Sequence, residues 1–111
     1  KGEVISADAA ERITRLMVSA VENGEAKWAA PKGYVVAGKT GTAQIAVEGH
    51  YDAEKTTASF IGFAPAKNPK FVMLVKLSEP QTSQWAAETA APLWFSIAKK
   101  LLIRYNIAPT N

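Results

Sequence analysis

The fold of this chain is decided by the segment YVVAGKTGTAQIAV, residues 34–47. Its content of β-branched and aromatic residues is typical of a β-strand, and near its middle it carries Lys39-Thr40-Gly41-Thr42. Alternate side chains of a strand share a face, so Thr40 and Thr42 point the same way. Lys39 comes from the other side of the strand, and Gly41 has no side chain to keep another backbone at a distance. We therefore expect a strand that presents two hydroxyls and one positive charge to a ligand.

Two more segments rich in β-forming residues follow this strand at short intervals. They are Thr57–Ala64 and Phe71–Leu77. The links before them, Gly49–Asp52 and Pro65–Pro69, are rich in residues that favour turns. Short links favour antiparallel neighbours, so the sequence predicts a three-stranded antiparallel meander.

A helix is predicted on each side of the three strands. The segment Ser6–Asn23 has apolar residues at helical spacing and begins with a residue suited to an N-cap. The second helix is predicted from Gln84 to about Tyr105. Pro92 costs roughly 3 kcal/mol inside a helix, so this helix either begins near Ala91 or kinks there. Its predicted apolar face consists of Ala87, Ala90, Ala91, Trp94, Ile97, Ala98, Leu101 and Tyr105. The fold class is therefore α+β, an antiparallel sheet with packed helices.

Composition excludes several classes of function. The 111 residues fit one domain or part of one, and the net charge of +3 is mild. Because no basic stripe with interleaved aromatic residues is present, we predict no nucleic-acid partner. The chain has no cysteine, which excludes disulfides and thiolate metal sites. No apolar run approaches the roughly 20 residues of a membrane-spanning helix.

A few conspicuous side chains are predicted to have ordinary structural roles. His50 is the only histidine and lies in a turn-rich link, so we expect a surface residue and predict no metal site. Trp28 lies in the connector after the first helix and is predicted to join the core. Lys99, Lys100 and Arg104 are expected on a solvated helix face.

The tetrapeptide and its surroundings resemble a known family. A Lys-Thr/Ser-Gly triplet on a strand is one of three short motifs of the active-site serine penicillin-recognising enzymes. The triplet is followed by Thr42-Ala43-Gln44, by ASFIGFAP at 58–65 and by APLWF at 91–95. In this order and spacing they resemble the C-terminal part of the transpeptidase domain of class B penicillin-binding proteins, of the division or elongation type. The resemblance runs from about Ile5 to Pro109, so we expect residues 1–111 to be the C-terminal portion of such a domain.

The resemblance implies how this portion fits into a larger fold. Domains of the family have a five-stranded antiparallel sheet with helices on both faces. This chain would supply three adjacent strands and two helices packed on one face. We expect the motifs Ser-x-x-Lys, which holds the nucleophile, and Ser-x-Asn to lie in the N-terminal remainder of the same protein and not in this chain.

The resemblance also implies a substrate and a role for each residue of the tetrapeptide. The substrate would be a peptidoglycan stem peptide ending in D-Ala-D-Ala. Its carboxylate would meet the hydroxyls of Thr40 and Thr42 and the charge of Lys39, while Gly41 admits its backbone. The backbone N–H of Thr42 would be a catalytic donor to the oxyanion, and β-lactams would bind the same groups. No cofactor is implied, and the domain would face outward from a membrane anchor outside this chain.

Three other functions stay open from the sequence. A serine β-lactamase and a penicillin-sensing receptor domain share this fold and the Lys-Thr/Ser-Gly strand. A small non-enzymatic α+β module could carry the triplet by chance. The residues N-terminal to this chain would distinguish the first two from a transpeptidase.

Overall fold

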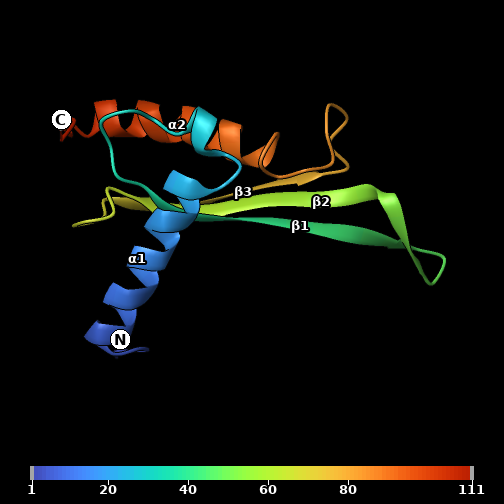
Figure 1. Ribbon diagram of the computed structural model, residues 1–111, viewed down its shortest axis with the longest axis horizontal. Coiled ribbons are helices and arrows are strands. Elements are labelled where there is room, and N and C mark those ends of the chain that lie inside the picture. Colours follow the sequence, from blue (N-terminus) through green and yellow to red (C-terminus); the bar gives the residue numbers. More distant parts are fainter. Residues whose placement is uncertain (1, 111) are drawn as a thin grey trace.

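The computed structural model describes residues 2–110, and Figure 1 shows two α-helices and a three-stranded sheet, with α2 lying along the sheet. The predicted α+β class and the order helix, three strands, helix are confirmed. A short 3₁₀-helix follows the first α-helix. In chain order the elements are α1 (Ala7–Asn23), η1 (Lys27–Ala29), β1 (Ala37–Val47), β2 (His50–Ala64), β3 (Phe71–Ser78) and α2 (Ala90–Arg104).

The three strands form the predicted antiparallel meander in the order β1-β2-β3. The second strand is longer than expected, because it begins at His50 and not at Thr57. Its first residues pair with the end of β1, starting at Val47 opposite His50. Glu48 and Gly49 form the tip with φ values of 50° and 82°, as a two-residue hairpin turn with positive φ at both positions requires. Figure 1 shows the resulting hairpin extending beyond α2.

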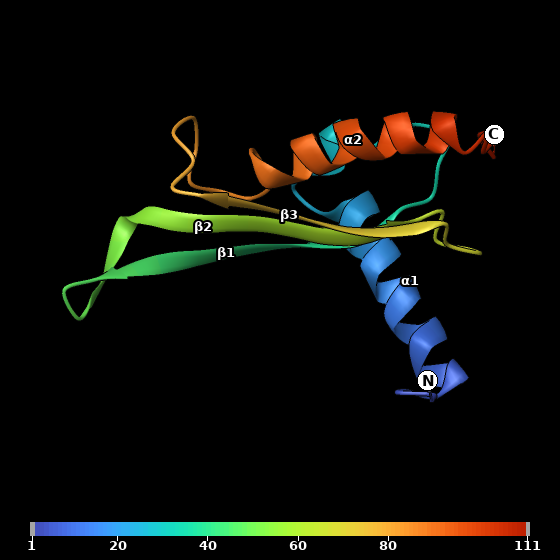
Figure 2. The same ribbon diagram turned by 180° about the vertical axis from the view of Figure 1, so that it is seen from behind.

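The core lies between α2 and one face of the sheet (Figures 1 and 2). Trp94 of α2 packs on Phe60 of β2 with the ring centroids 5.1 Å apart. Its indole Nε1 donates a hydrogen bond of 2.8 Å to the carbonyl of Met73 in β3. Burying a large apolar side chain stabilises the fold by about 1.5–3 kcal/mol, so these contacts fix α2 across β2 and β3.

The start of α2 resolves the two alternatives left by Pro92. The helix begins at Ala90, so Pro92 lies in its first turn, where the missing N–H has no intrahelical partner to lose. The prediction of helix from Gln84 is wrong. Gln84 lies in a bend and residues 86–89 form turns instead.

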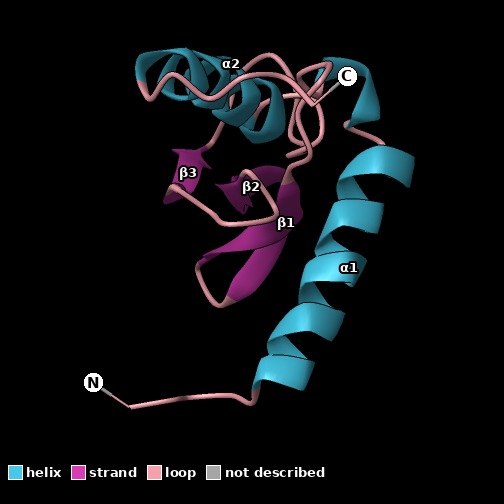
Figure 3. Cartoon of the chain, turned by 90° about the vertical axis from the view of Figure 1, so that its left-hand side faces the viewer, coloured by secondary structure: helices cyan, strands magenta, loops and turns pink. Residues whose placement is uncertain are grey.

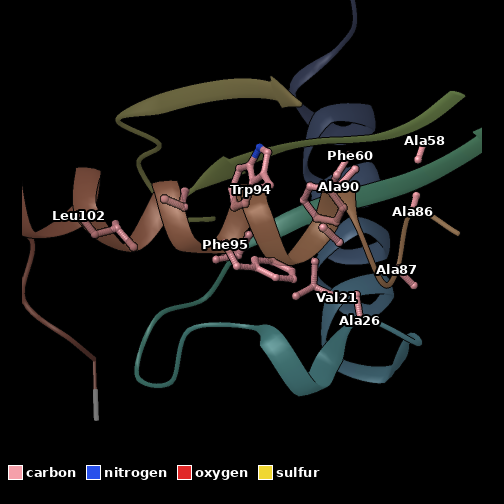
Figure 4. Packing of buried hydrophobic residues seen from close by; sticks show 14 residues of the cluster. Val21, Ala26, Ala58, Phe60, Ala86, Ala87, Ala90, Trp94, Phe95 and Leu102 are labelled. Atoms are coloured by element: carbon pink, nitrogen blue, oxygen red, sulfur yellow. The ribbon is translucent and has the colours of Figure 1, made fainter. Parts of the chain in front are cut away.

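The buried face of α2 is also rotated from the predicted one. Phe95 and Leu102 are buried, although neither was predicted on the apolar face, while Tyr105 is exposed. Phe95 and Leu102 belong to the same buried cluster as Trp94, and Figure 4 shows all three side chains on α2. Lys99, Lys100 and Arg104 are exposed, as predicted.

Helix α1 begins as predicted but lies in a different place. The Ala9 N–H donates to the Ser6 hydroxyl oxygen at 3.1 Å, which confirms Ser6 as the N-cap. The helix contacts β1, whereas α2 contacts β2 and β3. Figure 3 shows α1 alongside β1 and not on the face that α2 covers, so the prediction that both helices pack on one face is wrong. Only Val21, near its C-terminal end, is buried in the core.

The prediction that Trp28 joins the core is wrong as well. Trp28 lies in η1 and is 66% exposed. The small neighbours Ala29 and Ala30 pack against the core in its place. Sequence periodicity is absent from so short an element, so nothing in the sequence indicates which of its side chains points inward.

The sheet face opposite α2 is apolar and open. Alternate residues of β2 and β3 point to it, and Ile61, Val72 and Leu74 are 47%, 70% and 60% exposed. Within residues 2–110, no helix is long and apolar enough to span a membrane.

Gly62 of β2 is predicted to be essential for packing under α2. A Cβ there would lie 2.8 Å from the Ala37 carbonyl oxygen and 2.9 Å from Trp94 Cζ2. Gly62→Ala is therefore expected to lower the free energy of unfolding by about 1–3 kcal/mol, the usual cost of overpacking. Urea unfolding measures the change, and Gly2→Ala is the matched control because nothing lies within 4 Å of its added methyl. An unchanged midpoint for Gly62→Ala would contradict the packing described.

Candidate active site

The four residues of the tetrapeptide lie on β1, on both faces of the strand. Thr40 pairs with Phe60 and Thr42 with Ala58, and both partners belong to the buried core. Directly opposite residues of an antiparallel pair point to the same face, so the two threonines share one face, as predicted, and it is the face that α2 covers. Lys39 lies on the other face, opposite Ile61.

The Lys39 ammonium reaches Thr40, although the two residues lie on opposite faces of β1. Lys39 Nζ lies 3.2 Å from the Thr40 carbonyl oxygen and 3.3 Å from Thr40 Oγ1 and donates to both. Lys39 is exposed and Thr40 is partly exposed. An ammonium group has three donors, so a ligand anion beside Thr40 can be met by the same positive charge.

Thr42 makes a contact that the sequence did not indicate. The Ala86 N–H, in the segment between β3 and α2, donates to Thr42 Oγ1 at 3.1 Å. A hydroxyl accepts through two lone pairs and donates one hydrogen, so this contact leaves the hydroxyl hydrogen available to an acceptor. Thr42 is exposed, so its hydroxyl remains accessible from solvent.

Gly41 lies close to a neighbouring side chain. Ser59 Oγ on β2 donates to the Gly41 carbonyl oxygen at 3.3 Å, and a Cβ on Gly41 would lie 2.8 Å from the same Oγ. The absence of a side chain at position 41 therefore lets Ser59 bind the peptide group that joins Gly41 to Thr42.

A cavity of about 400 Å³ adjoins the tetrapeptide. It lies between the C-terminal end of α1, the start of β1 and the segment that precedes α2. Lys39 and Thr40 line it together with Glu25 and Ala87. A larger cavity, of about 910 Å³, is lined by residues of α1, the turn after β2 and the C-terminal tail, and includes none of the tetrapeptide.

One stretch of α2 has the spacing of the nucleophile motif, so the prediction that this chain lacks Ser-x-x-Lys is wrong. It is Ser96-Ile97-Ala98-Lys99, in which Ser96 and Lys99 are exposed. Both side chains line a cavity beside Pro31 and Lys32, which shares no residue with the cavity at Lys39. The structure therefore does not bring this serine together with the tetrapeptide.

In the described part of the chain, no group of three or more His, Cys, Asp or Glu side chains is placed to hold a metal ion. His50 is exposed at the start of β2, next to the hairpin tip, as predicted. The groups that β1 offers to a ligand are the Thr40 and Thr42 hydroxyls and the Lys39 ammonium.

Comparison with protein families gives one match over most of the chain. Residues 1–102 match the model of the penicillin binding protein transpeptidase domain. The probable peptidoglycan D,D-transpeptidase PenA of Neisseria flavescens is 38% identical over 110 residues, which cover 97% of this chain and 28% of that protein. Stage V sporulation protein D of Bacillus subtilis is 37% identical over 110 residues, which cover 98% of this chain and 17% of that protein. The chain thus spans less than a third of each relative.

Solved structures agree with the sequence comparison. The transpeptidase domain of penicillin-binding protein 3 from Burkholderia pseudomallei superposes with a TM-score of 0.88 at 34% identity, over 99% of this chain and 34% of that one. Penicillin-binding protein 3 from Mycobacterium tuberculosis, in complex with ampicillin, gives a TM-score of 0.85 at 31% identity, over 96% of this chain and 26% of that one.

Proposed function

Because the chain belongs to the penicillin-binding protein transpeptidase family, we propose that it is the C-terminal portion of a serine peptidoglycan D,D-transpeptidase domain. The whole domain would crosslink stem peptides ending in D-Ala-D-Ala and would be acylated by β-lactams. One observation supports this most: β1 carries two hydroxyls and an ammonium group beside a cavity, on the strand where the family has its Lys-Thr/Ser-Gly triplet.

The proposed task of the side chains is to hold the carboxylate of the acyl donor. Thr40 and Thr42 share a face, and each can donate its hydroxyl hydrogen to a carboxylate oxygen. Lys39, whose ammonium lies 3.3 Å from Thr40 Oγ1, can add a further hydrogen bond to the same carboxylate. Hydrogen bonds in which a partner is ionised are roughly twice as strong as neutral ones. The carboxylates of a stem peptide and of a penicillin would both satisfy these groups.

The proposed task of the backbone is to stabilise the transition state. When a serine attacks the scissile carbonyl, the carbonyl oxygen gains negative charge and needs preorganised donors. Within residues 2–110, β1 is an edge strand, and alternate N–H groups of an edge strand point away from its neighbour. We assign the Thr42 N–H to the oxyanion, with Gly41 leaving room for the substrate backbone.

The nucleophile and base are proposed to come from an N-terminal remainder with Ser-x-x-Lys and Ser-x-Asn. The open apolar face formed by Ile61, Val72 and Leu74 supports this, because soluble domains rarely leave such a patch uncovered. The small share of each relative that the chain spans supports it too. We place the complete domain on the outer side of the cell membrane, anchored by a segment outside this chain.

The other functions considered are less well supported. The relatives named above are called transpeptidases, sporulation or penicillin-binding proteins and not β-lactamases or receptors. A chance triplet in an unrelated module does not account for a family match over residues 1–102.

The location of the covalent adduct tests the proposed function. The full-length protein is treated with a fluorescent penicillin and digested, and the labelled peptide is identified by mass spectrometry. We expect a stoichiometric adduct on a serine outside residues 1–111, and we expect Ser96→Ala to label like the wild type, because Ser96 is not at the site. No adduct, or an adduct on Ser96, would contradict the proposal.

A further inference from the structure

Two threonines lie side by side on the α2 face of the β1–β2 hairpin. Thr42 of β1 pairs with Ala58, and Gln44, two residues on, pairs with Thr56 of β2. Thr42 and Thr56 are therefore diagonal neighbours on one face. Thr42 is exposed, whereas Thr56 is one of the two buried polar residues in the described part of the chain, at 3% exposure.

Both threonines bind the segment of residues 79–89, which links β3 to α2. Thr56 Oγ1 donates to the Gln84 carbonyl oxygen at 2.7 Å, and the Ala86 N–H donates to Thr42 Oγ1 at 3.1 Å. The Glu79 N–H donates to the Thr56 carbonyl oxygen at 2.9 Å. The segment is thus attached to the hairpin at three points, and Figure 4 shows Ala86 at the same end of the core as Ala58.

The attachment has a consequence for the Thr42 hydroxyl. Its oxygen accepts from Ala86, so its single hydrogen is directed elsewhere, which is the arrangement that a carboxylate ligand needs. Hydrogen bonds in such a chain, from N–H to O–H to carboxylate, polarise and strengthen one another. The Gln84 carbonyl lies two residues before Ala86, so the buried Thr56 hydroxyl holds the donor in place.

We propose that Thr56 is a positioning residue, which fixes Ala86 so that the Thr42 hydroxyl is oriented to donate to a ligand carboxylate. This rests on the proposed function, because it assigns a carboxylate to Thr42. Thr56 itself does not touch the ligand. Its hydroxyl acts through Gln84, the Ala86 N–H and Thr42 in turn.

The inference is tested in the full-length protein with two variants. Thr56→Val deletes the hydroxyl and keeps the shape of the side chain, whereas Thr56→Ser keeps the hydroxyl. The second-order acylation rate constant is measured with a penicillin and with its carboxamide analogue. Losing one net hydrogen bond slows the reaction by about 3- to 10-fold, so we expect that loss for the penicillin with Thr56→Val, and near wild-type rates with Thr56→Ser. With the carboxamide, Thr56→Val and wild type should react alike.

Two controls separate positioning from a merely structural role. Thr57→Val deletes a hydroxyl from the opposite face of the same strand and should leave both rates unchanged. In a Thr42→Val background, Thr56→Val should cause no further slowing, because coupled residues are not additive.

Other results would overturn either the positioning role of Thr56 or the assignment of a carboxylate to Thr42. Equal slowing of the penicillin and the carboxamide, or additive effects of Thr42→Val and Thr56→Val, would overturn the positioning role while the proposed function stands. So would a wild-type rate for Thr56→Val. A wild-type protein that no penicillin acylates, or a Thr42→Val variant that reacts at the full rate, would overturn the assignment of a carboxylate to Thr42, and this inference with it.

Discussion

Replacing the backbone amide of Thr42 by an ester, through semisynthesis of the complete domain, is expected to slow acylation by a β-lactam about 100- to 1,000-fold. That is the usual effect of removing one oxyanion donor. The ester keeps the hydroxyl and the shape of the strand and deletes the N–H, and it also weakens the Gly41 carbonyl oxygen as the acceptor for Ser59. The acylation rate is measured at a saturating concentration of β-lactam, from the mass of the intact protein over time.

Two side-chain variants show whether the backbone or the hydroxyl of Thr42 causes the effect. Thr42→Ala keeps the N–H, so acylation should fall only modestly. Thr42→Pro also removes the N–H, but it can distort an edge strand and needs a normal melting curve beside it. If the ester acylated as fast as the amide, the Thr42 N–H would have no part in stabilising the oxyanion.

Lys39→Ala is expected to slow acylation about 10- to 150-fold, because a hydrogen bond to a charged group contributes roughly 1.5–3 kcal/mol. Thr40→Val should have an effect of the same order, since Lys39 Nζ and Thr40 Oγ1 lie 3.3 Å apart and would share one carboxylate. Stopped-flow measurement of the second-order rate constant gives both values.

His50→Ala serves as the matched control for Lys39→Ala, because it removes a polar side chain from the same hairpin, next to the tip. No change is expected, since His50 lies near the far end of the strands from Lys39. A Lys39→Ala variant that acylated at the wild-type rate would show that the ligand carboxylate is held by other groups.

Local sequence signals predicted most of the elements. The Ser6 N-cap and helical spacing located α1, and β-forming segments with short links gave the meander. The errors fall where tertiary contacts override local pattern. The first residues of β2 are polar and turn-rich, and they are strand because they pair with β1. Residues 84–89 have a helical pattern, yet they make turns because Gln84 and Ala86 bond to the hairpin.

The candidate site also has features that the sequence predicts and features that it does not. The tetrapeptide Lys39–Thr42 and the faces of its side chains follow from the sequence, because they need only one strand. The groups that bind the tetrapeptide do not follow from the sequence, because Ala86 and Ser59 lie 44 and 18 residues away from their partners along the chain. Thr56 likewise carries no local signal, and only the register of β1 and β2 places it beside Thr42.

A crystal structure of the complete domain acylated by a penicillin tests the central claim most directly. We predict that the ligand carboxylate lies about 2.5–3.0 Å from the hydroxyl oxygens of Thr40 and Thr42, and that the acyl carbonyl oxygen lies about 2.7–3.2 Å from the Thr42 nitrogen. The covalent bond should lead to a serine outside residues 1–111. A ligand whose carboxylate and carbonyl oxygen are bound by other residues, with β1 beyond hydrogen-bonding distance, would contradict the claim that this strand holds the acyl donor.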